Sequence, residues 1–214
     1  MRLQHARVAL ELHELSQRDG PALLLLHALG GSSADWSETP ALWPGRVYGL
    51  DFCGHGRSEW VRGGVYVPEL LAGDVEVALT HIGSATLAGA GIGAYVALLM
   101  AGGRAARIPA ALLLPGRGLA GGGGEPDFDR NPLTLMTPTA GETLPAGCDP
   151  YCGTLQFDTR PPGYAARFAE AARRLLLLED GTERPPWWVA ARSAPGTAVI
   201  EGDVRSALVQ LGEV

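Results

Sequence analysis

The stretch ATLAGAGIGAYVALLMA, residues 85–101, decides how we expect this chain to fold. Its first residues are small and apolar, as in a buried strand, and residues 92–103 have the composition of an apolar helix. Gly89, Gly91 and Gly93 lie at the junction, where glycine allows backbone conformations that other residues resist. The stretch therefore predicts a strand, a sharp turn and a helix.

The segments around this unit alternate between apolar runs and helical patterns. Residues 22–28, 46–52 and 110–116 are largely apolar runs, and residues 8–15 alternate apolar with polar residues. Residues 68–82 have apolar residues at helical spacing behind a proline. Continuous apolar strands separated by helices are typical of a parallel sheet covered on both faces. We expect an α/β fold with a mostly parallel central sheet and residues 8–15 near its edge.

The character of the chain changes after residue 116. Residues 117–162 are rich in Gly, Pro and Thr and predict a short irregular lid. An amphipathic helix with Tyr164, Phe168 and Ala172 on one face follows, and it leads into a strand near residues 175–178. A short helix at 185–193, a strand at 197–202 and a closing helix complete the pattern. The expected division is a core of residues 1–116 and 163–214, with residues 117–162 as the lid.

Composition excludes several classes of function. The length of 214 residues suits one domain, and the net charge of −6 comes without any basic run, so nucleic-acid binding is not expected. No apolar run approaches a membrane span, and the N-terminal residues lack a signal-peptide core. We expect a cytoplasmic protein without membrane contact or cofactor. A homo-oligomer remains open.

Three motifs carry a family resemblance. They are LLLLHALGGSSADW at residues 23–36, VYGLDFCGHGRSE at 47–59 and GAGIGA at 89–94. In this order and spacing they closely resemble the oxyanion loop, the Asp-x-x-Gly-His-Gly-x-Ser turn and the nucleophile elbow of the α/β-hydrolase family. The resemblance covers residues 8–115 well and the C-terminal part loosely. It implies the α/β-hydrolase fold.

The resemblance also implies where an oxyanion hole would lie. Its donors would be the backbone amides of Leu29 and Ile92, beside His27 and Ala28, which replaces the usual glycine. The family's nucleophilic serine is replaced by Gly91. Glycine has no side chain that could attack an acyl group. The nucleophile position is therefore chemically silent.

The other two members of a catalytic triad are expected after the last two strands. Asp180 or Glu183 occupies the acid position, and Arg205 stands where the family has its histidine. All five histidines lie within the first 81 residues, so no histidine follows the elbow. Arginine stays charged and cannot accept the proton. Two of the three triad positions therefore lack the required chemistry.

Other candidate nucleophiles are weak. Ser32, Ser33 and Ser58 lie in loops where the resemblance implies that serines cap helices. Cys53 follows a central strand and is the best thiol, but no base is identified beside it apart from His55 two residues on. A reactive cysteine needs a specific electropositive setting. We expect none of these side chains to act as the nucleophile.

No metal site is predicted. A set of Asp51, His27 and His55 has little support in the sequence. Cys148 and Cys152, in the sequence CDPYC, are close enough for a disulfide or a metal. No second cysteine pair or histidine near them in sequence completes a zinc site, so free thiols in a loop are expected.

Two main functional hypotheses follow. The first is a hydrolase-fold protein without serine-hydrolase activity that binds a small molecule or a partner. Arg205 would then pair with an anionic ligand, or form a structural ion pair with Glu183 or Asp180. The second is an active hydrolase, lyase or isomerase of the same fold, acting by a non-standard mechanism on a small carbonyl or anionic substrate.

Two further features allow alternative interpretations. Gly89, Gly91 and Ala94 also match the dinucleotide fingerprint Gly-x-Gly-x-x-Gly/Ala, although no acidic residue follows at the usual interval. Arg117 would then have to hold a 2′-phosphate, which makes dinucleotide binding the third alternative. The tryptophans at 187 and 188 are interpreted either as an interface patch or as half-buried packing.

Overall fold

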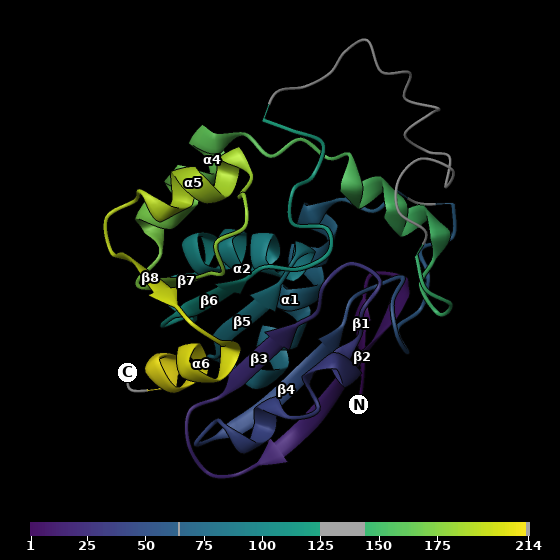
Figure 1. Cartoon of the computed structure of the whole chain (residues 1–214). Coiled ribbons are helices and arrows are strands. Elements are labelled where there is room, and N and C mark those ends of the chain that lie inside the picture. Colours follow the sequence, from purple (N-terminus) through teal and green to yellow (C-terminus); the bar gives the residue numbers. More distant parts are fainter. Residues whose placement is uncertain (64, 125–143, 213–214) are drawn as a thin grey trace.

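A computed structural model describes residues 1–63, 65–124 and 144–212. The described strands form one eight-stranded sheet with the order β1-β2-β4-β3-β5-β6-β7-β8 (Figure 1). Its strands are β1 (Arg2–His5), β2 (Val8–Gln17), β3 (Leu23–Leu26), β4 (Arg46–Asp51), β5 (Thr86–Ala90), β6 (Ala111–Leu114), β7 (Leu175–Glu179) and β8 (Thr197–Glu201). β2 is antiparallel to both β1 and β4, whereas β4, β3 and β5 to β8 run parallel. This arrangement confirms the predicted α/β fold.

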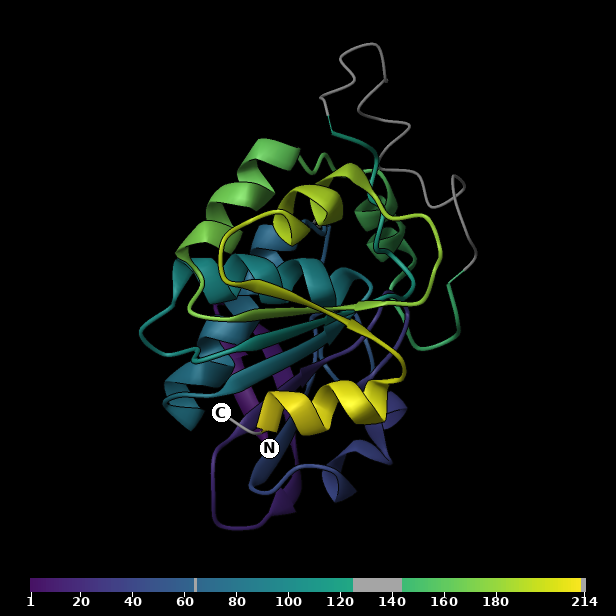
Figure 2. The ribbon, with the colours of Figure 1, turned by 60° about the vertical axis from the view of Figure 1, so that its left-hand side comes forward.

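Helices cover both faces of the sheet. The helices are α1 (Pro68–Ile82), α2 (Ile92–Gly103), α4 (Pro162–Ala171), α5 (Pro186–Arg192) and α6 (Val204–Gly212). The described residues also form the short 3₁₀ helices η1 (Ser33–Trp36), η2 (Thr39–Ala41) and η3 (Pro150–Gln156). Figure 2 shows α2, α4 and α5 on one side of the sheet and α6 on the other.

The alternation of side chains along β3 explains its unbroken apolar run. Leu24 and Leu26 join the core beneath α1 and α2, and Leu23 and Leu25 join the core beneath α6. Successive strand residues point to opposite faces, so a strand covered on both sides needs apolar residues at every position. All four leucines of β3 are fully buried.

Most predicted elements lie where the sequence placed them. α1 covers the same residues, 68–82, that its pattern predicted, and β2 lies next to the sheet edge as expected. The edge strand β1 was not predicted, because its sequence RLQH has no apolar alternation of its own. It pairs with β2 through a tight turn in which Ala6 has a φ of 52°.

The lid prediction is only partly open to comparison. Residues 117–124 and 144–162 are described, and residues 125–143 lie outside the described part of the chain. Before α4 begins at residue 162, the described portion contains the 3₁₀ helix η3 and neither an α-helix nor a strand. Within the described ranges, no helix combines the length and apolar character needed to cross a bilayer.

The interpretation of Trp187 and Trp188 as an interface patch is wrong. Both indoles are buried, at 1% and 0% exposure. Trp187 packs edge-on against Tyr95 of α2, and the Trp188 Nε1 donates a hydrogen bond to Glu179 at 2.9 Å. The first turn of α5 therefore directs both indoles into the hydrophobic core shared with α2.

Candidate functional site

The turn between β5 and α2 has the geometry that its glycines predicted. Gly91 is the residue before α2 and has a φ of 59° and a ψ of −119°. This conformation is strained for a residue with a side chain and open to glycine. The chain therefore turns sharply from strand to helix at the carboxyl end of the central strand.

A backbone carbonyl fills the space above this turn. The amide nitrogens of Leu29 and Ile92 both donate hydrogen bonds to the carbonyl oxygen of Arg117, each at 3.1 Å. Two backbone N–H groups converging on one oxygen form the arrangement that an oxyanion hole uses. Here the oxygen belongs to the protein itself, in the loop after β6.

The same bonds affect the dinucleotide alternative. The Gly91 amide donates to Leu114 and the Ile92 amide to Arg117, both at 3.1 Å. A pyrophosphate at a helix N-terminus needs such amides to be free. The first two amides of this turn are already paired within the chain and are not available to a pyrophosphate.

Two buried side chains hold the loop of Arg117 in place. The Nη1 of Arg160 donates to the carbonyl oxygens of Gly118 and Leu119, at 2.7 and 2.6 Å. The Trp187 Nε1 donates to the same oxygen of Leu119 at 2.8 Å. Arg160 is 1% exposed and pairs with Asp158 at 2.8 Å. The loop whose carbonyl oxygen accepts from Leu29 and Ile92 is thus fixed by buried polar contacts.

His27 is held neutral and fully bonded. Its Nδ1 donates to the carbonyl oxygen of Ala28 at 2.7 Å, and its Nε2 accepts from the Phe52 amide at 3.1 Å. Burial, with help from the nearby charge of His55, lowers the pKa of His27 to about 3. Neither ring nitrogen is left to act as a base or to bind a metal.

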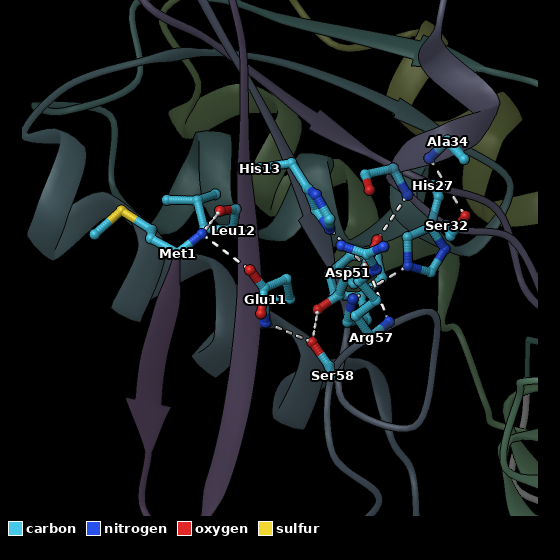
Figure 3. Close-up of polar contacts among 12 residues, drawn as sticks. Met1, Glu11, Leu12, His13, His27, Ser32, Ala34, Asp51, Arg57 and Ser58 are labelled. Carbon is cyan, nitrogen blue, oxygen red and sulfur yellow. Dashed lines mark hydrogen bonds and ion pairs between the residues drawn. The ribbon is translucent and has the colours of Figure 1, made fainter.

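Asp51 organises the second motif (Figure 3). Its carboxylate accepts from the amides of Ser33 and Arg57, at 2.7 and 2.9 Å, and lies 3.0 Å from the His13 Nε2. Burial opposes ionisation, but these hydrogen bonds outweigh it and hold the pKa of Asp51 below its ordinary value. The hydroxyl of Ser58 donates to the Asp51 carbonyl. Asp51 therefore has a structural role. Its carboxylate and both His27 nitrogens already have hydrogen-bond partners, so the structure does not favour a metal site built from these two residues.

The remaining nucleophile candidates have structural partners. The Ser32 hydroxyl accepts from the Ala34 amide at 3.3 Å, and the Asp35 carboxylate accepts from the Ser32 amide at 3.0 Å. This reciprocal pair caps η1. Burial and the nearby Asp74 raise the pKa of the Cys53 thiol. Neither Ser32 nor Cys53 is activated for attack.

The acid position lies in the loop after β7. Asp180 accepts from the Thr182 amide at 3.0 Å and the Arg184 Nη2 at 2.7 Å. Hydrogen bonds from Thr182, followed by the charge of Arg184, lower the pKa of Asp180 to about 2. Glu183 lines an open depression of about 530 Å³ beside Gly116.

Arg205 lies on the first turn of α6 and is exposed. Asp180 pairs with Arg184 rather than with Arg205. The structure brings the amides of Leu29 and Ile92 together at Gly91, whereas Asp180 is bonded to Thr182 and Arg184.

A cavity of about 200 Å³ lies at the carboxyl ends of β3, β5 and β6. Val204 reaches it from α6, whereas Arg205 is not among its lining residues. The Trp36 indole N–H is buried without a partner among the described residues. The lining consists of His27, Ala28, Asp35, Trp36, Ala90, Leu114, Pro115 and Val204.

The structure also brings together residues that the sequence kept apart. His55 lies beside Cys148 and Cys152, and one ligand atom of each lies within 4.8 Å of the other two. Both thiols are free, as expected, but a histidine that is distant in sequence lies beside them. Their spacing was visible in the sequence, but the partner comes from a turn more than ninety residues earlier.

Comparison with known proteins defines the fold. No protein-family model matches the chain, and no curated protein matches it. The enol-lactonase from Burkholderia xenovorans LB400 is 18% identical and has a TM-score of 0.72, over 95% of this chain and 91% of that chain. A thermophilic esterase from Thermogutta terrifontis is 18% identical at a TM-score of 0.65, over 100% and 94%. The bottromycin epimerase BotH, in complex with bottromycin A2, is 16% identical at 0.65, over 99% and 96%. The chain has the α/β-hydrolase fold.

Proposed function

We propose that this protein lacks serine-hydrolase activity and works as a binding protein for a small molecule or a partner. The observation that carries the proposal is the double hydrogen bond from Leu29 and Ile92 to the Arg117 carbonyl oxygen. A substrate's oxyanion would have to displace that oxygen, and Gly91 offers no group to form the covalent intermediate.

The absence of a competent base supports the same conclusion. His27 is buried at the oxyanion loop, but its pKa of about 3 and its two hydrogen bonds leave it neutral and occupied. General base catalysis works best with a pKa near the working pH. The described residues thus offer neither an activated nucleophile nor a competent base at this edge of the sheet, which supports a protein without acyl-transfer activity.

The 200 Å³ cavity is the candidate binding site. It lies at the carboxyl ends of parallel strands, where ligands bind in open α/β sheets. Its lining is largely apolar and includes the acidic side chain of Asp35, whereas Arg205 is absent from it. We therefore propose a small neutral ligand in place of the anionic one that Arg205 suggested.

An activity test addresses the first half of the proposal. The purified protein is assayed with short-chain nitrophenyl esters and labelled with a fluorophosphonate probe, beside an active serine esterase as the positive control. We expect no turnover above background and no labelled serine. Turnover that co-purifies with the protein, or a label on Ser32, Ser33 or Ser58, would refute the assignment.

A binding test addresses the second half. Thermal shifts are measured with phenol and cyclohexanol, and with benzoate as an anionic comparator. Val204→Phe should fill the cavity and abolish the shift, while Val209→Phe, on the same helix but outside the cavity, should keep it. Preferential stabilisation by benzoate would instead support the anionic ligand. The absence of any shift would count against this cavity as the site.

A non-hydrolytic enzyme is the second candidate. The epimerase BotH has a similar fold, so this architecture accommodates reactions other than hydrolysis. The amides of Leu29 and Ile92 could polarise a substrate carbonyl only if the carbonyl oxygen of Arg117 moved away from them. Mass spectrometry of a bound ligand before and after incubation separates the two candidates, because a binding protein returns its ligand unchanged.

A further inference from the structure

Three buried side chains with metal-binding chemistry meet at the turn after β4. One ligand atom each from His55, Cys148 and Cys152 lies within 4.8 Å of the other two. His55 and Cys152 are fully buried, and Cys148 is 6% exposed. The cluster joins the turn after β4 to the beginning of η3.

Several hydrogen bonds fix the two segments against each other. The Asp149 amide donates to the Gly54 carbonyl oxygen at 2.7 Å. The Asp149 carboxylate accepts from the Tyr151 amide at 3.0 Å and the Tyr66 hydroxyl at 2.8 Å. These contacts hold residue 149 and the first residues of η3 against the turn after β4. The two thiols, four residues apart, are thereby directed to the same side.

Gly54 makes the close approach of Cys152 feasible. It has a φ of 78°, and a Cβ at this position would lie 2.6 Å from the Cys152 sulfur. Glycine is thus required both by the backbone conformation and by the sulfur that packs against it. The backbone of this turn therefore packs directly against the Cys152 sulfur.

The His55 ring has one nitrogen without a partner. Its Nδ1 lies 3.1 Å from the Cys53 carbonyl oxygen, to which it donates in the tautomer that makes this bond. Its Nε2 is buried and has no hydrogen-bond partner among the described residues. Buried polar atoms are normally satisfied. The ring nitrogen near the thiols is Nδ1, 3.8 Å from the Cys152 Sγ, so an ion bound there through Nδ1 would take the place of its contact with the Cys53 carbonyl.

The sulfur atoms have only long contacts. The Cys148 Sγ lies 3.6 Å from the Asp149 carbonyl oxygen, and the Cys152 Sγ lies 3.8 Å from the His55 Nδ1. Zn–S bonds of about 2.3 Å at a tetrahedral angle place two sulfurs about 3.8 Å apart. Separations up to 4.8 Å therefore need only a small closure to bind one ion.

We propose that His55, Cys148 and Cys152 form a binding site for a thiophilic d¹⁰ cation, Zn²⁺ or Cu⁺. Two thiolates and an imidazole are ligands that both ions prefer, and Cys-x₃-Cys is within the spacing of zinc sites. Two thiolates with Zn²⁺ and a neutral imidazole carry no net charge, whereas Cu⁺ leaves one negative charge. Burial penalises net charge, so Zn²⁺ is the expected ion.

This cation would tie residues 148–152 of the lid to the turn at residues 54–55. Binding releases up to two protons, one from each thiol that was protonated. The site has no lining residue in common with the proposed small-molecule cavity, but the His55 ring lies 4.9 Å from the ring of His27, which lines that cavity. Its role is structural, stabilising the folded protein by preferential binding to the native state.

Titration of the whole reduced protein tests the site. Zn²⁺, Cu⁺ and Co²⁺ are added anaerobically with a phosphine reductant present. We expect one equivalent of Zn²⁺ to bind, a higher melting temperature and protection of two of the three thiols from alkylation. Co²⁺ should give a thiolate charge-transfer band. Cys148→Ser and Cys152→Ser should each weaken Zn²⁺ binding by more than about 100-fold, since even outer-shell changes cost 10–100-fold.

Cys53→Ser is the matched control, because Cys53 is also a buried thiol and lies outside the cluster. It should bind Zn²⁺ as the wild type does. Equal binding by Cys148→Ser, or no uptake by the wild type, would overturn the proposal. A Cys148–Cys152 disulfide that survives metal addition under the reductant would also overturn it. If the serine variants fail to fold, the Co²⁺ spectrum and the alkylated peptides of the wild type decide the question alone.

Discussion

The carbonyl oxygen of Arg117 occupies the space that a Cβ on Gly91 would need. The loss of a side chain at this turn and the position of the following loop are therefore one structural feature. As long as the loop lies there, a residue with a side chain cannot occupy the turn without displacing the loop. The glycine also accepts the φ of 59° at little cost.

Gly91→Ser should destabilise the protein rather than restore an esterase. The strained backbone conformation costs about 1 to 3 kcal/mol for a residue with a side chain, and overlap with Arg117 adds to that cost. Urea unfolding should show a lower free energy of unfolding, and nitrophenyl ester turnover should stay at background even when combined with Arg205→His.

Gly163→Ser provides the control for this change. Gly163 lies in the first turn of α4, and a Cβ there would meet no atom within 4 Å. Its substitution should leave the unfolding free energy nearly unchanged. A Gly91→Ser variant as stable as the Gly163→Ser variant would show that the loop of Arg117 moves away freely.

Arg160→Met should loosen the loop that fills the oxyanion position. The guanidinium bonds the carbonyl oxygens of Gly118 and Leu119, pairs with Asp158 and lies over the Tyr95 ring at 4.7 Å. Its removal leaves a largely buried carboxylate and buried carbonyls unpaired, which costs about 3 kcal/mol or more.

Hydrogen exchange gives the specific readout for Arg160→Met. The amides of Leu29 and Ile92, which donate to Arg117, should exchange faster in the variant. Arg167→Met, an exposed arginine on α4, should change neither exchange nor stability. Unchanged protection of both amides in Arg160→Met would mean that other contacts hold the loop.

The fold was largely readable from the sequence because its signals are local. The apolar run of β3 and the proline-started pattern of α1 each carry their own periodicity. β1 has no such pattern and gains its place by pairing with β2. The tryptophan pair was ambiguous because the burial of these two indoles depends on what α5 packs against rather than on the local sequence.

The site was predictable at Gly91 and not around it. The motif order named Leu29 and Ile92, which belong to local loop motifs, and the structure shows their amides converging on one carbonyl oxygen. The position of the Arg117 carbonyl oxygen does not depend on a particular side chain, so no sequence pattern predicted it. Likewise, His55 meets Cys148 only through tertiary folding, which spacing rules over short stretches do not capture.

The pair of His5 and Asp74 should make stability depend on pH. The His5 Nδ1 lies 2.6 Å from the Asp74 Oδ1, and Asp74 is fully buried. The hydrogen bond to Asp74 raises the pKa of His5 above 6.5, although partial burial opposes it. The folded state therefore holds the proton more tightly than the unfolded chain does.

The unfolding free energy should accordingly fall as pH rises above 6.5 and level off once His5 has lost its proton in the folded state. This contribution is fully present below pH 6.5. The unfolded chain protonates His27 near pH 6.5 and the folded state only near pH 3, so acidification between these two values should destabilise the protein. His5→Gln keeps a donor for Asp74 but no titratable group, and should flatten the alkaline limb. His81→Gln, at an exposed site on α1, should preserve that limb. Urea unfolding between about pH 6 and 9 measures both, and an identical slope in His5→Gln and wild type would refute the assignment.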